Sequence, residues 1–527
     1  MAKFNRAGRL ARGAAGPVRT TGAAATTFEG GPAWSRDAKS DLFLLAVTNM
    51  VGEDTFYEGA TERDERFRRL AGQVAVEDAD WTARFIPWLR SEANMRSASL
   101  VAAAEAVRAR LAAGLAGHNR QLVDAACQRA DEPGEILAYW TSRYGRALPQ
   151  PVKRGVADAA TRLYSQYGLL KYDSDAHGFR FGDVIDLVHP VPREPWQGEL
   201  FAHALDRRHN RDKPIPEALG TLRAREDLMA VPPEARRDVL REDGAAARLD
   251  AAGITWEALA GWLQGPMDAA AWEAVAPSMG IFALLRNLRN FDQAGLSDQA
   301  AERIAARISD PDVIARSRLF PYRFLSAYRA APSLRWGQAL ERALEHSVAA
   351  IPQLPGRTLV LVDTSASMRR QVSARSVVTH ADIGALTGVA LARRGCATDL
   401  VGFADRVFRH RLDRGGSMLP AMDRFTSRIG EVGHGTRIVE SLYHSYRGHD
   451  RVIIVSDMQT FAPLRGQPVS VSDAVPAQVP VFGINTSGYA PSALNTAVPG
   501  RYEIGGFSDK VFTMLGLLAG GSTGWPF

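Results

Sequence analysis

The stretch Thr358-Leu-Val-Leu-Val-Asp-Thr-Ser-Ala-Ser-Met368 joins a short apolar run to a string of side chains that carry oxygen. Two further apolar runs of the same kind follow at 450–455 and 479–484, and helical patterns lie between the runs. Continuous β-branched runs are typical of parallel strands that are buried on both faces. Their alternation with helices predicts a doubly wound α/β domain over residues 354–527.

The oxygen-bearing side chains after the first run have the chemistry of a metal site. In a doubly wound sheet the carboxyl end of a strand opens onto the ligand crevice, so Asp363, Ser365 and Ser367 are predicted to lie there. Asp457 follows the second run, and Thr436 lies in a Gly-rich stretch before a helix. Two carboxylates and three hydroxyls favour Mg²⁺, a hard cation that prefers oxygen ligands. The alternative is that these residues only cap helices and turns.

This pattern resembles the metal-ion-dependent adhesion site of von Willebrand factor A domains. The resemblance implies that Ser365, Ser367 and Thr436 bind the cation directly, and that Asp363 and Asp457 act partly through water. It also implies that an acidic group from a partner completes the coordination of the metal. The residue after Thr436 is an arginine where many such domains carry an acidic residue, which makes the rim of the site more basic.

The first part of the chain has a different pattern. Amphipathic helical patterns return from about residue 40 to residue 348, separated by short breakers. Helices joined in pairs by short loops stack as a solenoid, so residues 31–353 are predicted to be an all-α helical-repeat domain. Residues 1–30 carry basic side chains among Gly, Ala and Thr, and they are predicted to be a mobile basic arm.

Several passages of the helical part resemble the TROVE region of Ro autoantigen-type proteins. In chain order they are Phe43-Leu-Leu-Ala46, Phe56-Tyr57, Lys171-Tyr172, Asp183-Val-Ile-Asp-Leu-Val-His-Pro190, Thr255-Trp-Glu257 and Met279-Gly-Ile-Phe-Ala-Leu-Leu-Arg-Asn-Leu288. The resemblance implies an all-α ring of HEAT-like helices followed by a von Willebrand factor A-like domain. It implies that the ring accepts single-stranded ends of misfolded RNAs and that its outer surface binds small Y-type RNA. It further implies a monomer in a ribonucleoprotein, working beside an exoribonuclease such as polynucleotide phosphorylase.

The resemblance also implies RNA contacts at Lys171 and His189, which match the Lys-Tyr and His-Pro motifs. Lys171 offers a positive charge to phosphate, and His189 can stack on a base. The family carries a basic residue shortly after the lysine; here Arg180 is predicted to replace it. The alternatives are a solvated charge at Lys171 and a histidine that only shapes a turn at His189. Arg286 and Asn287 lie within an apolar helix, where they are expected to stabilise packing.

Composition is compatible with this interpretation. A formal net charge of +6 and a pI near 9.4 suit an anionic partner. Two cysteines far apart, no apolar stretch of membrane length and no secretory leader predict a cytoplasmic protein without a membrane contact. No Gly-x-Ser-x-Gly motif surrounds Ser365 or Ser367, so we expect no hydrolase. The resemblance to Ro-type proteins, which are not known as nucleases, implies that the chain is not an enzyme. The main alternative is a metal-dependent protein-interaction scaffold that binds no RNA.

Overall fold

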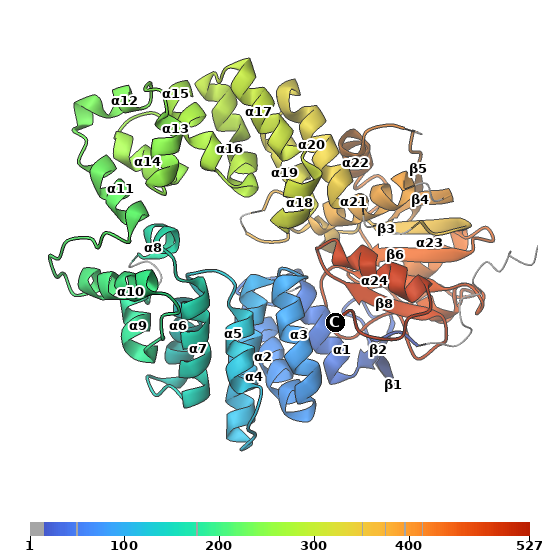
Figure 1. Cartoon of the computed structure of the whole chain (residues 1–527). Helices are drawn as coiled ribbons and strands as arrows, with labels where there is room; N and C mark the ends of the chain where they lie inside the picture. The colour runs from blue at the N-terminus through green and yellow to red at the C-terminus, as the bar shows by residue number, and fades with distance from the viewer. Residues whose placement is uncertain are drawn as a thin grey trace, which may run out of the picture.

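The computed structural model describes residues 15–527 except 49–50, 175–177, 350, 352, 375, 395–396 and 414. Within them the chain forms a long helical part and then a sheet flanked by helices (Figure 1). None of the described helices combines the length and the apolar character that a membrane crossing requires. The helices of the first part are α1 (Ala38–Thr48), α2 (Ala60–Glu77), α3 (Ala79–Ser91), α4 (Arg96–Ala112), α5 (Asn119–Ala126), α6 (Glu132–Tyr144), α7 (Gln150–Leu163), α8 (Gln166–Tyr172), α9 (Phe181–Val188), α10 (Pro195–Arg208), α11 (Gly220–Met229), α12 (Arg236–Val239), α13 (Ala245–Ala251), α14 (Trp256–Leu263), α15 (Ala269–Val275), α16 (Ile281–Ala294), α17 (Asp298–Ile308), α18 (Pro311–Ser317), α19 (Tyr322–Ala330) and α20 (Leu334–Ser347).

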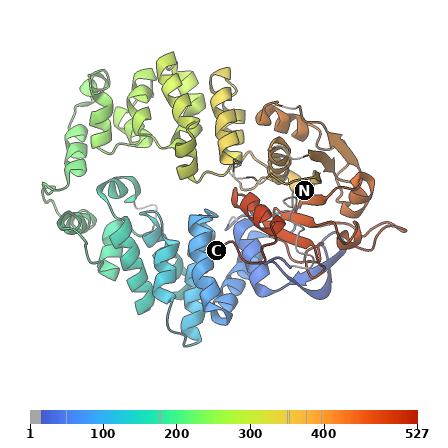
Figure 2. The same ribbon diagram turned by 45° about the vertical axis from the view of Figure 1, so that its right-hand side comes forward.

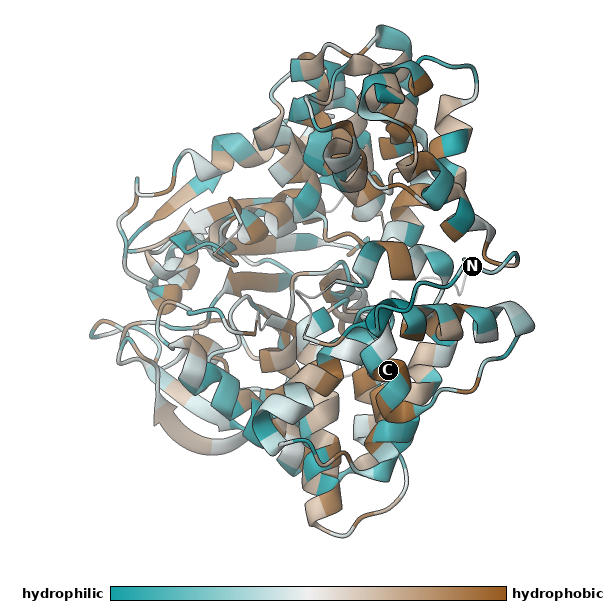
Figure 3. Cartoon of the chain, turned by 90° about the vertical axis from the view of Figure 1, so that its left-hand side faces the viewer, coloured by the Kyte–Doolittle hydropathy of each residue, from teal (hydrophilic) through white to brown (hydrophobic). Residues whose placement is uncertain are grey.

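Neighbouring helices of this part pack side by side and follow a curved course whose two ends reach the sheet part (Figure 1, Figure 2). For example, α2 contacts α4, α5 contacts α7, α8 contacts α11, and α19 contacts α20. Hydrophilic and hydrophobic residues alternate around these helices in Figure 3, as the amphipathic patterns predicted. At the two ends of the course α1 contacts β8 and α20 contacts α22, so the sheet part completes a ring.

The second part is a six-stranded sheet with the order β5-β4-β3-β6-β7-β8. Its strands are parallel except for β5, which runs antiparallel to β4. The fold class predicted from the alternating runs is therefore confirmed. The elements are β3 (Arg357–Asp363), β4 (Ala397–Phe403), β5 (Val407–His410), β6 (Arg451–Ser456), β7 (Val481–Asn485) and β8 (Arg501–Gly505), with α21 (His380–Arg393), α22 (Met418–Thr426), α23 (Ile438–Ser445) and α24 (Lys510–Ala519).

Strand β3 shows why its sequence is a continuous apolar run. Leu359 and Leu361 pack in one core with residues of α23, whereas Val360 and Val362 belong to a second core that includes α21. Successive side chains of a strand point to opposite faces, so a strand covered on both sides needs apolar residues at every position. The predicted boundary at residues 353 and 354 falls between α20 and β3.

The expected basic arm is wrong for residues 20–30. Strand β1 (Thr20–Thr26) pairs antiparallel with β2 (Pro32–Arg36), and this hairpin packs on the sheet part. Its anchor is Arg36, whose guanidinium forms a buried ion pair with Glu503 of β8 at 2.7 Å. The backbone N–H of Thr20 also donates to the Thr496 hydroxyl at 2.8 Å. Pairing with these residues, which are distant in sequence, orders a polar segment that has little apolar surface of its own. Residues 1–14 of the predicted arm lie outside the described residues.

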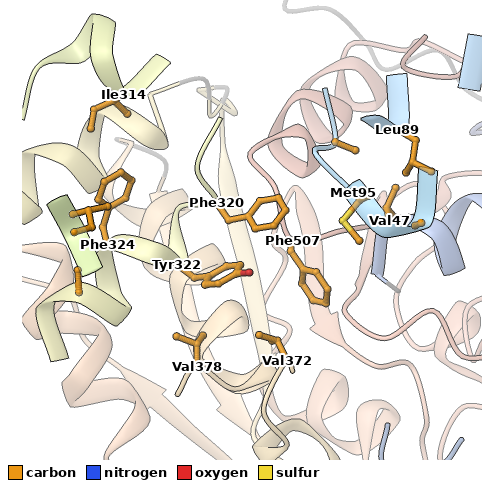
Figure 4. Packing of buried hydrophobic residues seen from close by; sticks show 14 of the residues in the cluster. Val47, Leu89, Met95, Ile314, Phe320, Tyr322, Phe324, Val372, Val378 and Phe507 are labelled. Carbon is orange, nitrogen blue, oxygen red and sulfur yellow. The ribbon is translucent and has the colours of Figure 1, made fainter. Parts of the chain in front are cut away.

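The ring closes through an apolar cluster at its junction with the sheet part (Figure 4). Phe320 and Tyr322, at the start of α19, belong to the same core as Phe507, Met95 and Val47. Beside this cluster the loop after α3 touches the segment before α19, because the Asn94 side-chain amide donates to the Arg318 carbonyl oxygen at 2.8 Å. The start and the end of the helical course therefore meet each other as well as the sheet.

Candidate metal centre and RNA-binding surface

The five predicted metal ligands lie at the carboxyl ends of adjacent strands and the loops that follow them. Asp363 ends β3, and Asp457 comes directly after β6, which pairs with β3 in parallel. Ser365 and Ser367 follow β3, and Thr436 comes two residues before α23. All five are buried. The sheet topology therefore brings to one edge the five residues that the sequence analysis selected.

Hydrogen bonds fix the two carboxylates within these loops. The backbone N–H of Ser365 donates to Asp363 Oδ1 at 2.9 Å, and the Ser456 hydroxyl donates to Asp363 Oδ2 at 2.6 Å. The backbone N–H of Gln459 donates to Asp457 Oδ1 at 3.1 Å. The hydroxyl oxygens of Ser365 and Ser367 are 3.3 Å apart. The site is a set of convergent oxygens that other hydrogen bonds hold in place.

The Thr436 loop is fixed to the Asp457 loop by the backbone. The Thr436 carbonyl oxygen accepts from the Phe461 N–H at 2.9 Å and from the Thr460 hydroxyl at 2.9 Å. Arg437, which follows Thr436, lies near two acidic residues at the rim of the site. Its guanidinium nitrogens are 4.0 Å from the Asp405 carboxylate and 3.9 Å from the Glu440 carboxylate. Its positive charge is therefore partly compensated outside the ligand set.

The electrostatics of this site favour a cation. Burial raises the pKa of Asp363 to about 6. Burial and the charge of Asp363 raise the pKa of Asp457 to about 7. Neither carboxylate forms an ion pair with Lys or Arg in the described part of the chain. Two buried carboxylates at one site repel each other unless a proton or a cation is shared between them.

The donor set also restricts the kind of cation. Over the described residues no three His, Cys, Asp or Glu side chains come together as metal ligands. The centre therefore depends on two carboxylates together with hydroxyls, a set that fits Mg²⁺ and its bound waters better than a thiolate- or imidazole-seeking ion. These residues fit the predicted Mg²⁺.

A second candidate surface lies on α8, on the inner side of the ring in both ribbon views (Figure 1, Figure 2). Ser165 caps this helix by accepting from the Gly168 N–H at 3.0 Å, which starts it in the register that exposes Lys171. The Lys171 ammonium lies 5.5 Å from the Tyr167 ring centroid and 5.3 Å from that of Tyr172. The Arg129 guanidinium lies 5.2 Å from the centroid of the same Tyr172 ring. We call Arg129, Tyr167, Lys171 and Tyr172 the α8 cluster.

The other two predicted RNA contacts have different environments. Arg180 lies at the N-terminus of α9 and forms an ion pair at 2.9 Å with Asp173, whose side chain is almost fully buried. His189 is exposed at the opposite end of α9, in a left-handed conformation that terminates the helix. Eight helical residues span about 12 Å, so the two residues are not brought together. RNA contacts at Lys171, His189 and Arg180 stay predictions, and the ion pair favours a packing role for Arg180.

Two further groups were missed by the sequence analysis. Arg286 does not stabilise the helix interior; it is exposed, and together with Arg323 it lies over the Phe282 ring at 5.8 and 5.4 Å. Asn287, by contrast, is buried and donates to the Ala283 carbonyl oxygen at 2.9 Å, as expected. The Phe282 and Arg286 positions are one helical turn apart, a spacing that could have indicated a shared exposed face. The second group is Glu29 and Tyr57, which form a hydrogen bond between two separate segments. No spacing pattern in the sequence indicates that these two residues meet.

Comparisons with known proteins agree with the motifs. Residues 252–369 match the family model of the TROVE domain. No curated protein matches the chain in sequence. Among solved structures, the fold is similar to the crystal structure of the Deinococcus radiodurans Ro (RSR) protein, with a TM-score of 0.62 and 17% identity over 92% of this chain and 100% of that one. The resemblance that the motifs predicted is confirmed: residues 252–369 match the TROVE domain, and the chain has the fold of a Ro protein.

Proposed function

We propose that this protein binds RNA and acts in the quality control of non-coding RNA in the cytoplasm. In this proposal the inner side of the helical ring receives single-stranded ends of misfolded RNAs, and the outer surface binds small Y-type RNA. The protein works as a monomer, catalyses no reaction itself, and presents RNA to an exoribonuclease such as polynucleotide phosphorylase. The observation that carries the proposal is the α8 cluster, because helix α8 lies on the inner side of the ring.

The α8 cluster has the chemistry that an unpaired strand requires. Partial burial lowers the pKa of Lys171, but its neighbours Tyr172 and Tyr167 raise it above its ordinary value, so the side chain is a cation at neutral pH. The exposed Tyr167 ring can stack on a base of any sequence, and the Tyr172 ring beside it is partly buried. Lys171 supplies a charge for the phosphates, whereas the charge of Arg129 is partly compensated by its ion pair with Asp131. Bases within a duplex are already stacked and paired, so this arrangement favours single-stranded RNA.

The test compares a blunt RNA hairpin with the same hairpin carrying a single-stranded 3′ tail, by fluorescence anisotropy at several salt concentrations. We expect the tail to strengthen binding, and Lys171→Ala to weaken binding of the tailed RNA about threefold to tenfold and to reduce the salt slope by about one. The matched control is Arg465→Ala, which removes one exposed positive charge from the sheet part. Equal affinity for the blunt and the tailed RNA rules out capture of single-stranded ends.

We also propose that the second part binds Mg²⁺, with Ser365, Ser367 and Thr436 as direct ligands and with Asp363 and Asp457 acting partly through water. The cation would supply a coordination position that an acidic group of a protein partner can fill. This site supports the alternative function, a metal-dependent protein-interaction scaffold. Treating a pull-down with RNase separates the two: loss of the co-purifying material supports RNA binding, and survival of a Mg²⁺-dependent protein partner supports the scaffold.

A further inference from the structure

The tip of the N-terminal hairpin lies against the loop that carries Asp457. The Thr27 hydroxyl donates to the Thr460 carbonyl oxygen at 2.6 Å, and the Gly31 N–H donates to the same oxygen at 3.0 Å. The backbone N–H of Phe28 donates to Gln459 Oε1 at 3.0 Å. Residues 27–31 are therefore fixed to a segment that begins two residues after a predicted metal ligand.

This tip presents a carboxylate that Tyr57 holds. The Tyr57 hydroxyl donates to Glu29 Oε1 at 2.5 Å, and the Tyr57 ring stacks on Phe28 with centroids 5.1 Å apart. Tyr489 packs edge-on against Tyr57 at 5.3 Å, and its hydroxyl accepts from the Phe56 N–H at 3.0 Å. Tyr57 thus has a fixed position between the hairpin and the sheet part.

Tyr57 and Glu29 also interact electrostatically with the predicted metal ligands. Partial burial, the hydrogen bond to Glu29 and the charge of Asp457 raise the pKa of Tyr57, whereas a hydrogen bond from Ser367 lowers it. The charge of Glu29 contributes in turn to the raised pKa of Asp457. The Tyr57 hydroxyl therefore binds Glu29, and both Ser367 and Asp457 are near enough to affect its pKa.

We infer that Glu29 and Tyr57 cover this chain's own metal centre, so that the N-terminal hairpin occupies the approach that a partner's carboxylate would need. The inference rests on the Mg²⁺ site proposed above. Glu29 forms no ion pair with the described residues, so its charge near Asp457 is unfavourable until a divalent cation binds and favourable afterwards. An acidic partner must then displace the hairpin before it reaches the metal.

The test uses the full chain and Mn²⁺ as the probe. Electron paramagnetic resonance gives the affinity for Mn²⁺, and the relaxation of water protons reports how many waters reach the bound ion. Glu29→Gln removes the charge but keeps an acceptor for Tyr57; we expect about fivefold or more weaker Mn²⁺ binding and faster water relaxation per bound ion. Tyr57→Phe, which keeps the ring contacts, is expected to show the same faster relaxation. The control is Glu62→Gln, at an exposed carboxylate of α2, which should change neither quantity.

The outcomes separate the two proposals. If the wild-type chain and the Ser365→Ala variant bind Mn²⁺ equally, the metal centre is wrong and this inference falls with it. If Ser365→Ala weakens Mn²⁺ binding but Glu29→Gln and Tyr57→Phe both match the wild type in affinity and relaxation, the metal centre stands and the internal cover is wrong.

Discussion

His380 is a buried ionisable residue that the proposed functions do not use. It is the first residue of α21, its ring lies 5.8 Å from that of Phe507, and its Nδ1 has no hydrogen-bond partner in the described part of the protein. Burial, followed by the charges of Arg63 and Arg370, lowers the pKa of His380 to about 4. The neutral ring therefore fits this place, and its protonation opposes folding.

We expect His380 to make the folded protein less stable in acid. A histidine whose pKa is lower in the folded state contributes fully to stability above pH 6.5, and the contribution is lost as the pH falls toward 4. At pH 5 the loss is about 2 kcal/mol. In thermal unfolding at pH 7 and pH 5, His380→Gln should lose less stability between the two pH values than the wild type. The control is His444→Gln, at an exposed histidine; equal pH dependence of wild type and His380→Gln contradicts the prediction.

At the same scale, the sequence predicted where the five candidate ligands lie, but it did not predict the contact between Glu29 and Tyr57. Asp363 and Asp457 end two apolar runs, and the rule that parallel strands open at their carboxyl ends places such residues together. Glu29 meets Tyr57 only because a hairpin packs on the far end of the chain. The ion pair between Arg180 and Asp173 was likewise not visible in the spacing of charged residues.

Among the elements, the hairpin β1–β2 depends on the close approach of Gly31 to the loop after β6. A Cβ atom at this position would lie 2.9 Å from the Phe461 carbonyl oxygen and closer still to that of Thr460, both of which are backbone atoms that cannot turn aside. We expect Gly31→Ala to displace the tip and to destabilise the chain by about 1 to 3 kcal/mol. Limited proteolysis should cleave the variant between residues 20 and 36 faster than the wild type.

The control for this prediction is Gly261→Ala in α14, where a Cβ atom would meet nothing within 4 Å. Alanine favours a helix over glycine, so this variant should melt at the wild-type temperature or above it. A Gly31→Ala variant with wild-type stability and wild-type resistance to protease contradicts the close approach that the structure shows.

The helices and strands differ in how far their sequences predicted them. The motif Thr255-Trp-Glu257 starts α14 because the Thr255 hydroxyl accepts from the Ala258 N–H at 3.2 Å, which is a local signal. Strand β1, Thr-Thr-Gly-Ala-Ala-Ala-Thr, has no alternation of apolar and polar residues and forms only because β2 and the sheet part supply its partners. Local sequence therefore predicts elements that stabilise themselves and misses those that other elements stabilise.

In the whole molecule, the two proposed binding sites lie in different parts of the ring. The contacts that close the ring join these two parts. Helix α8 and the strands β3 and β6, which lead to the predicted metal ligands, lie on opposite sides of the ring in Figure 1. The helical course reaches the sheet part at both ends, through α1 on β8 and through α20 on α22. A change of charge within either site leaves the packing between them unaltered, so the two binding functions should be separable by mutation.

The separation predicts opposite defects in two variants. Asp363→Ala should lose most of its affinity for Mn²⁺ and keep its affinity for a tailed RNA hairpin within about twofold, because substitutions at distant sites without shared partners act independently. Lys171→Ala should weaken RNA binding and leave Mn²⁺ binding unchanged. Both quantities are measured on both full-length variants, with thermal unfolding to establish that each is folded. If Asp363→Ala loses RNA affinity as strongly as metal affinity while melting like the wild type, the RNA site extends onto the sheet part, and the ring alone does not hold the strand.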